Sequence, residues 1–323
     1  MSGPDLLLPR RMARGRESEN TIAAPSYESF TSRFGDAFPR PRFLESDLGT
    51  TAVYELAPPP GQLATRRVLL VHGLNTPALG LLPLAAALRD ADPGAHVALF
   101  DLWGHGLSST PLAPHAAHLF HAQMLQVLVS LGWPSAHLLG YSFGGSLVAR
   151  FALHNPWAVE SAALLAPAGV MRRALLGAPL RALLDDPERG AASEAEAREG
   201  VLAFLEGGPL AVPADWAERS RRGEVVAEAL RAWELEAHAG YPHSVLSMAR
   251  EDNLFGREDD FRRFARLPHR KVVVLGEADD VCGPAELAGL GFEDVVVVPG
   301  TNHGIVRTAA KEVARIVYDM WTR

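Results

Sequence analysis

The sequence lacks features that mark several classes of protein. Its 323 residues include one cysteine, Cys282, so no disulfide forms within the chain and a cysteine-rich metal site is excluded. The net charge is −7 and the arginines are scattered, so no basic surface for nucleic acid is expected. No apolar run approaches a membrane span, and no basic segment leads into a hydrophobic signal core. We therefore expect a cytoplasmic protein.

The first 40 residues have no periodic pattern. Residues 1–16 contain four arginines and one acid, a composition that faintly resembles an organelle-targeting segment. Pro4 and Pro9 interrupt any amphipathic helix there. We expect residues 1–40 to be an irregular N-terminal extension.

Beyond residue 40, short apolar runs alternate with helical patterns. Residues 43–57 predict a hairpin that turns at Leu48–Gly49. Continuously apolar runs predict strands buried on both faces; they lie within residues 66–73, 96–106, 135–142, 160–169, 270–280 and 293–304. Between and after them, helical patterns occupy residues 79–91, 115–131, 143–156 and 284–289, and a last helix runs to residue 322.

Residues 170–266 interrupt this alternation. They are rich in Ala, Glu, Arg and Leu, and their apolar residues recur at helical spacing. Alternation on both sides of a helical insert predicts an α/β fold with a mostly parallel sheet flanked by helices. Residues 41–169 and 267–323 would form the core, and residues 170–266 a helical cap or lid.

Ser142 lies where an apolar strand pattern meets the start of a helix, in the stretch Gly140-Tyr141-Ser142-Phe143-Gly144. A serine on a tight strand-to-helix turn projects its hydroxyl above the carboxyl end of the sheet, and the flanking glycines let the turn close. The same five-residue pattern also arises by chance, with a helix-capping serine as its alternative reading. The assignment therefore depends on residues further along the chain.

Two downstream loops supply partners for a nucleophilic serine. His303 follows the last strand pattern, and the strand pattern before it leads into Glu277, Asp279 and Asp280, of which Glu277 lies too close to the strand. Both loops open on the same edge of the sheet as Ser142, in the chain order nucleophile, acid, histidine. A serine needs a base, and the base needs a group that orients it, so these residues indicate acyl transfer. A surface histidine and a helix-capping aspartate are the alternative readings.

Together these motifs resemble those of the α/β-hydrolase fold family, in its cap-bearing esterase and lipase branch. The matching stretches lie within residues 68–323 and are His72-Gly73-Leu74, Asp101 to Gly106 with Ser108, Gly140 to Gly144, Gly276 to Asp279, and His303. The resemblance implies Ser142 as nucleophile, His303 as general base and acid, and Asp279 as the carboxylate that orients the imidazole. Asp280 stays open as the alternative, because Gly283-Pro284 falls a position or so later than in the family pattern.

The oxyanion hole is expected from two backbone N–H groups, those of Leu74 and Phe143. His72 and His105 lie near Asp101 in Gly-rich loops, where we expect them to stabilise turns and not to bind a metal. Asp101 is an alternative nucleophile in principle, because haloalkane and epoxide hydrolases of this fold use an aspartate. Those enzymes carry their aspartate at the position that Ser142 occupies here, so this reading is disfavoured. Cys282 is expected to be a packed small hydrophobe.

These observations predict a serine hydrolase that cleaves a carboxylic ester, thioester or lactone through an acyl-enzyme, with no metal or organic cofactor. Its partner is a small-molecule substrate, largely apolar if aromatic and leucine side chains of the insert face the pocket; these are Leu202, Phe204, Trp216, Trp233 and Phe255. The main alternative is a carbon–carbon bond hydrolase of β-diketone or ring-fission type with the same three residues. Amide hydrolysis and cofactor-free perhydrolysis also stay open, and a non-catalytic ligand receptor is the alternative from another class.

Overall fold

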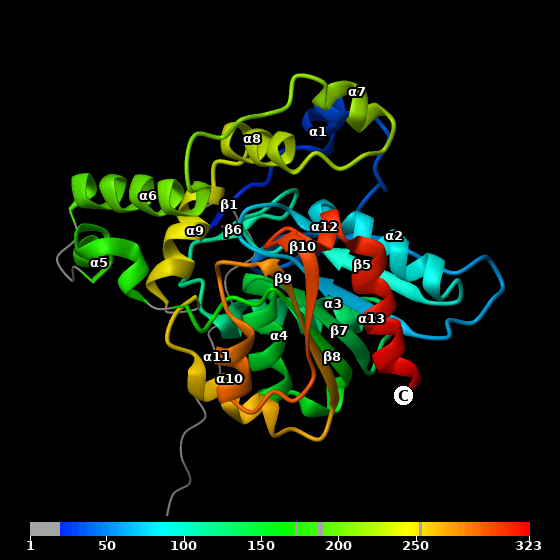
Figure 1. Ribbon diagram of the computed structural model, residues 1–323. Coiled ribbons are helices and arrows are strands. Elements are labelled where there is room, and N and C mark those ends of the chain that lie inside the picture. Colours follow the sequence, from blue (N-terminus) through cyan, green and yellow to red (C-terminus); the bar gives the residue numbers. More distant parts are fainter. Residues whose placement is uncertain (1–19, 172, 186–189, 252–253) are drawn as a thin grey trace, which may run out of the picture.

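The computed structural model describes residues 20–171, 173–185, 190–251 and 254–323 (Figure 1). An eight-stranded sheet with helices on both faces forms its centre, in the strand order β10-β9-β8-β7-β4-β5-β3-β2. In this order, each strand from β10 to β5 is parallel to its neighbours in that stretch. The next strand, β3, is antiparallel to both β5 and β2. The strands are β2 (Arg42–Ser46), β3 (Gly49–Leu56), β4 (Arg67–Val71), β5 (His96–Phe100), β7 (Ala136–Tyr141), β8 (Val159–Leu165), β9 (Arg270–Ala278) and β10 (Val295–Asn302). The expected α/β class and the β2–β3 hairpin are confirmed.

The central strands are buried on both faces, as their continuous apolar runs predict. The prediction is wrong for β10, which is an edge strand with Val297 38% exposed. In β4, Val68 and Leu70 pack on one side of the sheet, and Leu69 and Val71 pack on the other. One face is covered by α3 (Ala117–Ser130), α4 (Phe143–His154), α10 (Glu258–Ala265) and α11 (Pro284–Gly289). The other is covered by α2 (Leu82–Ala91), α12 (Ile305–Thr308) and α13 (Ala310–Thr322). Parallel strands need this double cover because each crossover returns over a face of the sheet.

The segment between β8 and β9 is helical, and Figure 1 shows most of it as a separate layer over one end of the sheet. Its main helices are α5 (Gly177–Asp185), α6 (Ala191–Glu206), α7 (Trp216–Arg221), α8 (Ala227–Ala237) and α9 (Tyr241–Arg250). No helix in the described ranges is both long and apolar enough to cross a membrane. We call α5–α9 the helical insertion.

The last helix of the expected insert, α10, belongs with the sheet instead. Phe261 and Phe264 are fully buried in the core beside α4, and Asp260 pairs with Arg150 of α4 at 3.4 Å. The expected boundary at residue 266 therefore lies too late in the chain. The sequence showed an amphipathic helix here, but its apolar face gives no information about which partner it meets.

Residues 20–40 also differ from the expected irregular extension, while residues 1–19, with the suggested targeting segment, lie outside the described residues. Residues 27–34 form α1 (Tyr27–Phe34), whose N-terminus is capped by the Ser26 side chain. Its apolar side packs Phe30 and Phe34 against Trp233 of the insertion, with ring centroids 5.1 and 6.1 Å away. An isolated helix of eight residues is unstable in water, so α1 depends on this contact.

Phe30→Ala is expected to lower the free energy of unfolding by about 3 to 5 kcal/mol, because it removes a buried ring from the contact between α1 and α8. Phe43→Ala is the matched control, since that ring is 41% exposed and its loss should cost under about 1 kcal/mol. Urea unfolding of both variants measures the difference. Equal losses would contradict the docking of α1.

Candidate active site

Ser142 occupies a strained turn between β7 and α4. Its backbone has φ 53° and ψ −119°, and among the described non-glycine residues only Ala166 shares a positive φ. Such backbone costs on the order of 1–3 kcal/mol and persists only where the surroundings enforce it. Here the neighbours are glycines: a Cβ on Gly140 would lie 2.2 Å from the Gly144 carbonyl oxygen, and one on Gly144 only 2.1 Å from that of Val71. The turn presents the Ser142 side chain at the carboxyl end of the sheet.

Ser142, His303 and Asp279 form one hydrogen-bonded chain. The Ser142 hydroxyl lies 3.0 Å from His303 Nε2, and His303 Nδ1 lies 3.1 Å from Asp279 Oδ1. When Nδ1–H donates to the carboxylate, Nε2 keeps the lone pair that faces the serine proton. The His303 side chain is 28% exposed, so the imidazole is open to solvent while the carboxylate of Asp279 is buried.

Asp279 is held in place, and Asp280 is not part of the chain. The Asp279 side chain is 1% exposed, and its Oδ1 also accepts a hydrogen bond of 3.0 Å from the Val281 N–H. Asp280 is exposed and makes no ion pair with His303 in the described structure. The geometry therefore favours Asp279 as the partner of His303.

Two backbone N–H groups flank the serine. A Cβ on Gly73 would lie 2.9 Å from Ser142 Cβ and 3.4 Å from its Oγ, so the loop after β4 lies directly against the hydroxyl. Within the described structure the N–H groups of Leu74 and Phe143 donate no hydrogen bond. Phe143 opens α4, where first-turn N–H groups have no helical partner and a negative charge is favoured. This pair can bind an oxyanion.

His72 holds the peptide that carries the Leu74 N–H. The Leu102 N–H donates to His72 Nε2 at 2.8 Å, so the neutral ring carries its proton on Nδ1. Nδ1–H then donates to the Gly73 carbonyl at 2.6 Å. Because that carbonyl and the Leu74 N–H belong to one planar peptide, the bond orients and polarises the donor. His72 thus stabilises a turn, as expected, and the structure adds which peptide it holds.

The other residues of the Gly-rich loops bind backbone groups. Asp101 is fully buried and accepts hydrogen bonds from the N–H groups of Ala78 and Leu107 and from the Tyr54 hydroxyl. Burial raises its pKa to about 6. His105 Nε2 donates to the Leu74 carbonyl at 3.0 Å. Within the described ranges, no three His, Cys, Asp or Glu side chains form a group that could hold a metal ion.

Cys282 lies in the apolar core next to the loop of Asp279, as expected for a packed small hydrophobe. Burial, and secondarily the nearby Asp279, raises the pKa of its thiol, so the thiol stays protonated. Its contribution is packing.

The helical insertion makes several contacts with these loops that the sequence did not indicate. The Tyr241 hydroxyl donates to the Leu74 carbonyl at 3.3 Å, and Asn75 donates to the Leu205 carbonyl at 2.8 Å. Glu234 is fully buried and accepts the Gly106 N–H at 2.7 Å. Tyr241, Leu205 and Glu234 come from separate helices at least 90 residues beyond these loops and carry no local motif, so only packing brings them here.

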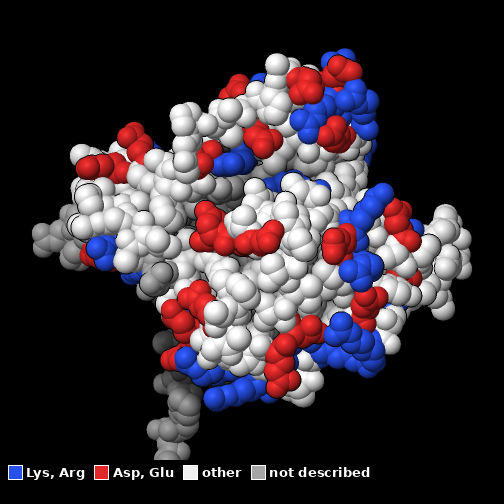
Figure 2. Space-filling view, viewed as in Figure 1, with Lys and Arg blue, Asp and Glu red and all other residues white. Residues whose placement is uncertain are grey.

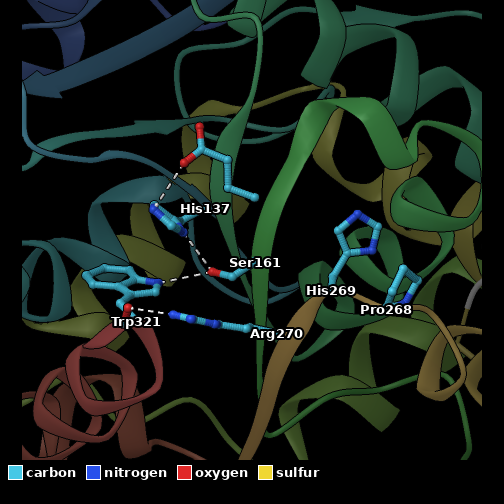
Figure 3. A pocket seen from close by; sticks show the side chains of 7 residues that line it. His137, Ser161, Pro268, His269, Arg270 and Trp321 are labelled. Carbon is cyan, nitrogen blue, oxygen red and sulfur yellow. Dashed lines mark hydrogen bonds and ion pairs between the residues drawn. The ribbon is translucent and has the colours of Figure 1, made fainter. Parts of the chain in front are cut away.

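A second serine, histidine and carboxylate meet at the opposite end of the sheet. There a cavity of about 420 Å³ is lined by Ser161, His137 and Glu160 (Figure 3). His137 contacts Ser161 at 2.8 Å and Glu160 at 3.3 Å, and the Trp321 indole N–H donates to Ser161 at 3.1 Å. Ser161 lies within β8, beside an irregularity in its pairing with β7, and is 1% exposed, so its hydroxyl joins α13 to the sheet and is not presented for attack.

A sequence comparison matches the α/β hydrolase fold family over residues 66–228, half of the chain. A putative carbamate hydrolase from Caulobacter segnis is 28% identical over 255 residues, which cover 75% of this chain and 85% of that protein.

Two solved structures share the fold at low sequence identity. An enol-lactonase from Burkholderia xenovorans is 17% identical with a TM-score of 0.63, covering 87% of this chain and all of that one. An esterase from Exiguobacterium antarcticum is 14% identical with a TM-score of 0.64, covering 88% of this chain and all of that one.

Gly144→Ala is expected to lower the free energy of unfolding by about 3 kcal/mol, because the added methyl group meets the rigid Val71 carbonyl. Gly289→Ala is the control, since a Cβ there meets nothing within 4 Å. Urea unfolding separates the two. An unchanged midpoint for Gly144→Ala would show that the turn relaxes.

His72→Asn isolates the titration of the buried ring. Burial lowers the pKa of His72 from its ordinary 6.5 to about 4, so the fold favours the neutral form. The contribution of the neutral His72 ring to the free energy of unfolding is fully present above pH 6.5 and is lost as the pH falls toward 4. The stability of the wild type relative to His72→Asn should therefore shrink by about 3 kcal/mol between pH 7 and pH 4. Urea unfolding at both pH values tests this, and a constant difference would refute it.

Proposed function

The chain belongs to the α/β-hydrolase fold family, and we propose that it is a serine hydrolase that cleaves a carboxylic ester through an acyl-enzyme. The observation that carries the proposal is the chain of two hydrogen bonds from Ser142 through His303 to Asp279, with the serine on a strained turn. Thioesters and lactones react by the same steps. None of the steps needs a metal or an organic cofactor.

In the first half of the reaction, His303 Nε2 takes the proton as Ser142 Oγ attacks the carbonyl carbon. The negative oxygen of the tetrahedral intermediate then accepts the N–H groups of Leu74 and Phe143. His303 passes the proton to the leaving alcohol as the carbon–oxygen bond breaks. Asp279 keeps the imidazole in the required tautomer and stabilises its positive charge.

In the second half, water replaces the alcohol. His303 takes a proton from the water, whose oxygen attacks the acyl carbon, and returns it to Ser142 Oγ as the acid leaves. A solvent-accessible His303 suits this step, because the water enters from the exposed side of the ring. In this proposal the helical insertion is the cap that selects the substrate.

Support for an acyl substrate also comes from the proteins this chain resembles, since carbamate and lactone carbonyls both react by serine attack. A carbon–carbon bond hydrolase would use the same three residues, so activity on a β-diketone in place of esters would favour that alternative. Tight ligand binding without turnover would favour a receptor.

Ser142→Ala is expected to lower ester hydrolysis at least about 10³-fold, because no other group can form the acyl-enzyme. A fluorophosphonate should label the wild type at Ser142, located by peptide mass, and should not label the variant. Ser161→Ala is the matched control and should keep both labelling and activity. Wild-type turnover by Ser142→Ala would refute the mechanism.

A further inference from the structure

The proposed general base reaches Ser142 from a distant part of the sheet. Ser142 directly follows β7, whereas His303 directly follows β10, and the strands β8 and β9 lie between these two. Neighbouring strands are about 4.8 Å apart, so roughly 14 Å separates the two strand ends. The loop that carries His303 must therefore cross this gap and be held at its far side.

Contacts to β9 hold the near end of that loop. Glu277, at the end of β9, accepts a hydrogen bond of 2.8 Å from the Gly300 N–H. Asp279 contacts His303 Nδ1 at 3.1 Å. Both carboxylates come from β9 or the loop after it, so neither joins the imidazole to β7. A hydrogen bond at Nδ1 also leaves the tilt of the ring unspecified.

Tyr141 provides a contact between β7 and the imidazole. It is the last residue of β7 and precedes Ser142, and its ring centre lies 5.3 Å from that of His303, with the two planes 35° apart. Rings at this separation are in direct contact. Tyr141 is only 6% exposed, so it presents little surface to a substrate. Its contact is with the base.

Arg307 holds this tyrosine in turn. It lies on α12, four residues after His303, and its guanidinium carbon is 5.8 Å from the centre of the Tyr141 ring. Burial raises the pKa of the Tyr141 hydroxyl, whose oxygen accepts a hydrogen bond from Arg307. A Cβ on Gly80 would lie 3.8 Å from the Arg307 Nη1, so the guanidinium is also close to the turn before α2.

The rest of the imidazole has less support. The helical insertion contacts loops at the carboxyl ends of the strands, and Figure 2 shows the surface hollowed between the insertion and the sheet. The His303 side chain is 28% exposed, so packing covers it only in part. Among the described residues, Tyr141 carries the one aromatic ring in contact with it. No second ring there would replace the tyrosine.

We propose that Tyr141, held by Arg307, is a positioning residue for the general base. Its ring fixes the tilt of the His303 imidazole, so that Nε2 stays aligned with the Ser142 hydroxyl. At 5.3 Å the tyrosine ring also attracts the positive charge that the imidazole gains when it takes the serine proton. This inference rests on the proposed serine hydrolase function.

The first test removes the ring. Tyr141→Leu is expected to lower both the rate at which a fluorophosphonate labels Ser142 and kcat for p-nitrophenyl butyrate, each about 10- to 100-fold, because the base is misaligned. KM should stay within about twofold, since the buried ring does not bind substrate. A raised KM with an unchanged kcat would assign the ring to substrate binding and overturn the inference.

Two milder variants test the link to Arg307 and do not require Tyr141→Leu to fold. Tyr141→Phe keeps the ring, so it should lose no more than about fivefold in labelling rate and restore most of what Tyr141→Leu loses. Arg307→Met should lose about as much as Tyr141→Phe. The double variant should lose no more than Arg307→Met alone, because both changes break one contact. Additive losses would overturn the proposal that Arg307 acts through Tyr141.

Tyr318→Leu is the matched control. The Arg66 guanidinium carbon lies 5.5 Å from the centre of the Tyr318 ring, so this pair has the same kind of contact. Because Arg66 precedes β4, the pair lies at the opposite end of the sheet from Ser142. Tyr318→Leu should leave the labelling rate unchanged. An equal loss in this variant would show a general effect on stability and overturn the inference.

A spectroscopic measurement separates positioning from a structural effect. With ¹³C-labelled histidine, the ring signal of His303 is the one that disappears in His303→Gln. An aromatic ring changes the chemical shift of protons beside it, so this signal should move in Tyr141→Leu and stay in place in Tyr318→Leu. An unmoved signal in a folded Tyr141→Leu protein would overturn the inference.

The outcomes distinguish the inference from the proposed function. Labelling of Tyr141→Leu at the wild-type rate would overturn the inference and leave the serine hydrolase function intact. No labelling of the wild type at Ser142 would refute the proposed function, and the inference with it.

Discussion

The arrangement of the site depends on the strained turn at Ser142. Its backbone lies in a region that non-glycine residues avoid, and it is enforced because Gly144 lets α4 approach the Val71 carbonyl. The same close approach brings the loop after β4 against the serine, so the Ser142 hydroxyl and the N–H groups of Leu74 and Phe143 are positioned by one packing constraint. A single methyl group at Gly144 would disturb all of them together.

A buried polar layer joins this turn to the helical insertion. Asp101 organises the loop after β5, and Glu234 of α8 binds the Gly106 N–H in that loop. Burial raises the pKa of Glu234 well above its ordinary range. Buried polar groups are costly unless they are hydrogen-bonded, so these contacts fix where the insertion can sit. The helical insertion is therefore positioned by directional hydrogen bonds as well as by apolar packing.

Charged side chains of both signs lie near the site. The Arg307 guanidinium carbon lies 5.8 Å from the centre of the Tyr141 ring, and Glu277, at the end of β9, and Asp280, just after it, are exposed. The expectation of a largely apolar substrate comes from the aromatic and leucine side chains of the insert. Trp233 instead packs on α1, and Phe255 is buried in the core. At least these two aromatic side chains of the insert therefore serve packing.

The alternation of strands and helices, the turn at Ser142 and the order of the three reactive residues can all be predicted from the amino-acid sequence. Parallel strands bring the loops after them to one edge of the sheet, so local patterns suffice to place Ser142, the acid loop and His303. The family resemblance already favoured Asp279 over Asp280, and the folded chain adds the contact of Asp279 with His303. The position of α10 against the sheet and the helix at residues 27–34 emerge only from the folded chain. Each of these depends on contacts between segments far apart in the chain, and the local pattern of a segment does not specify its partner.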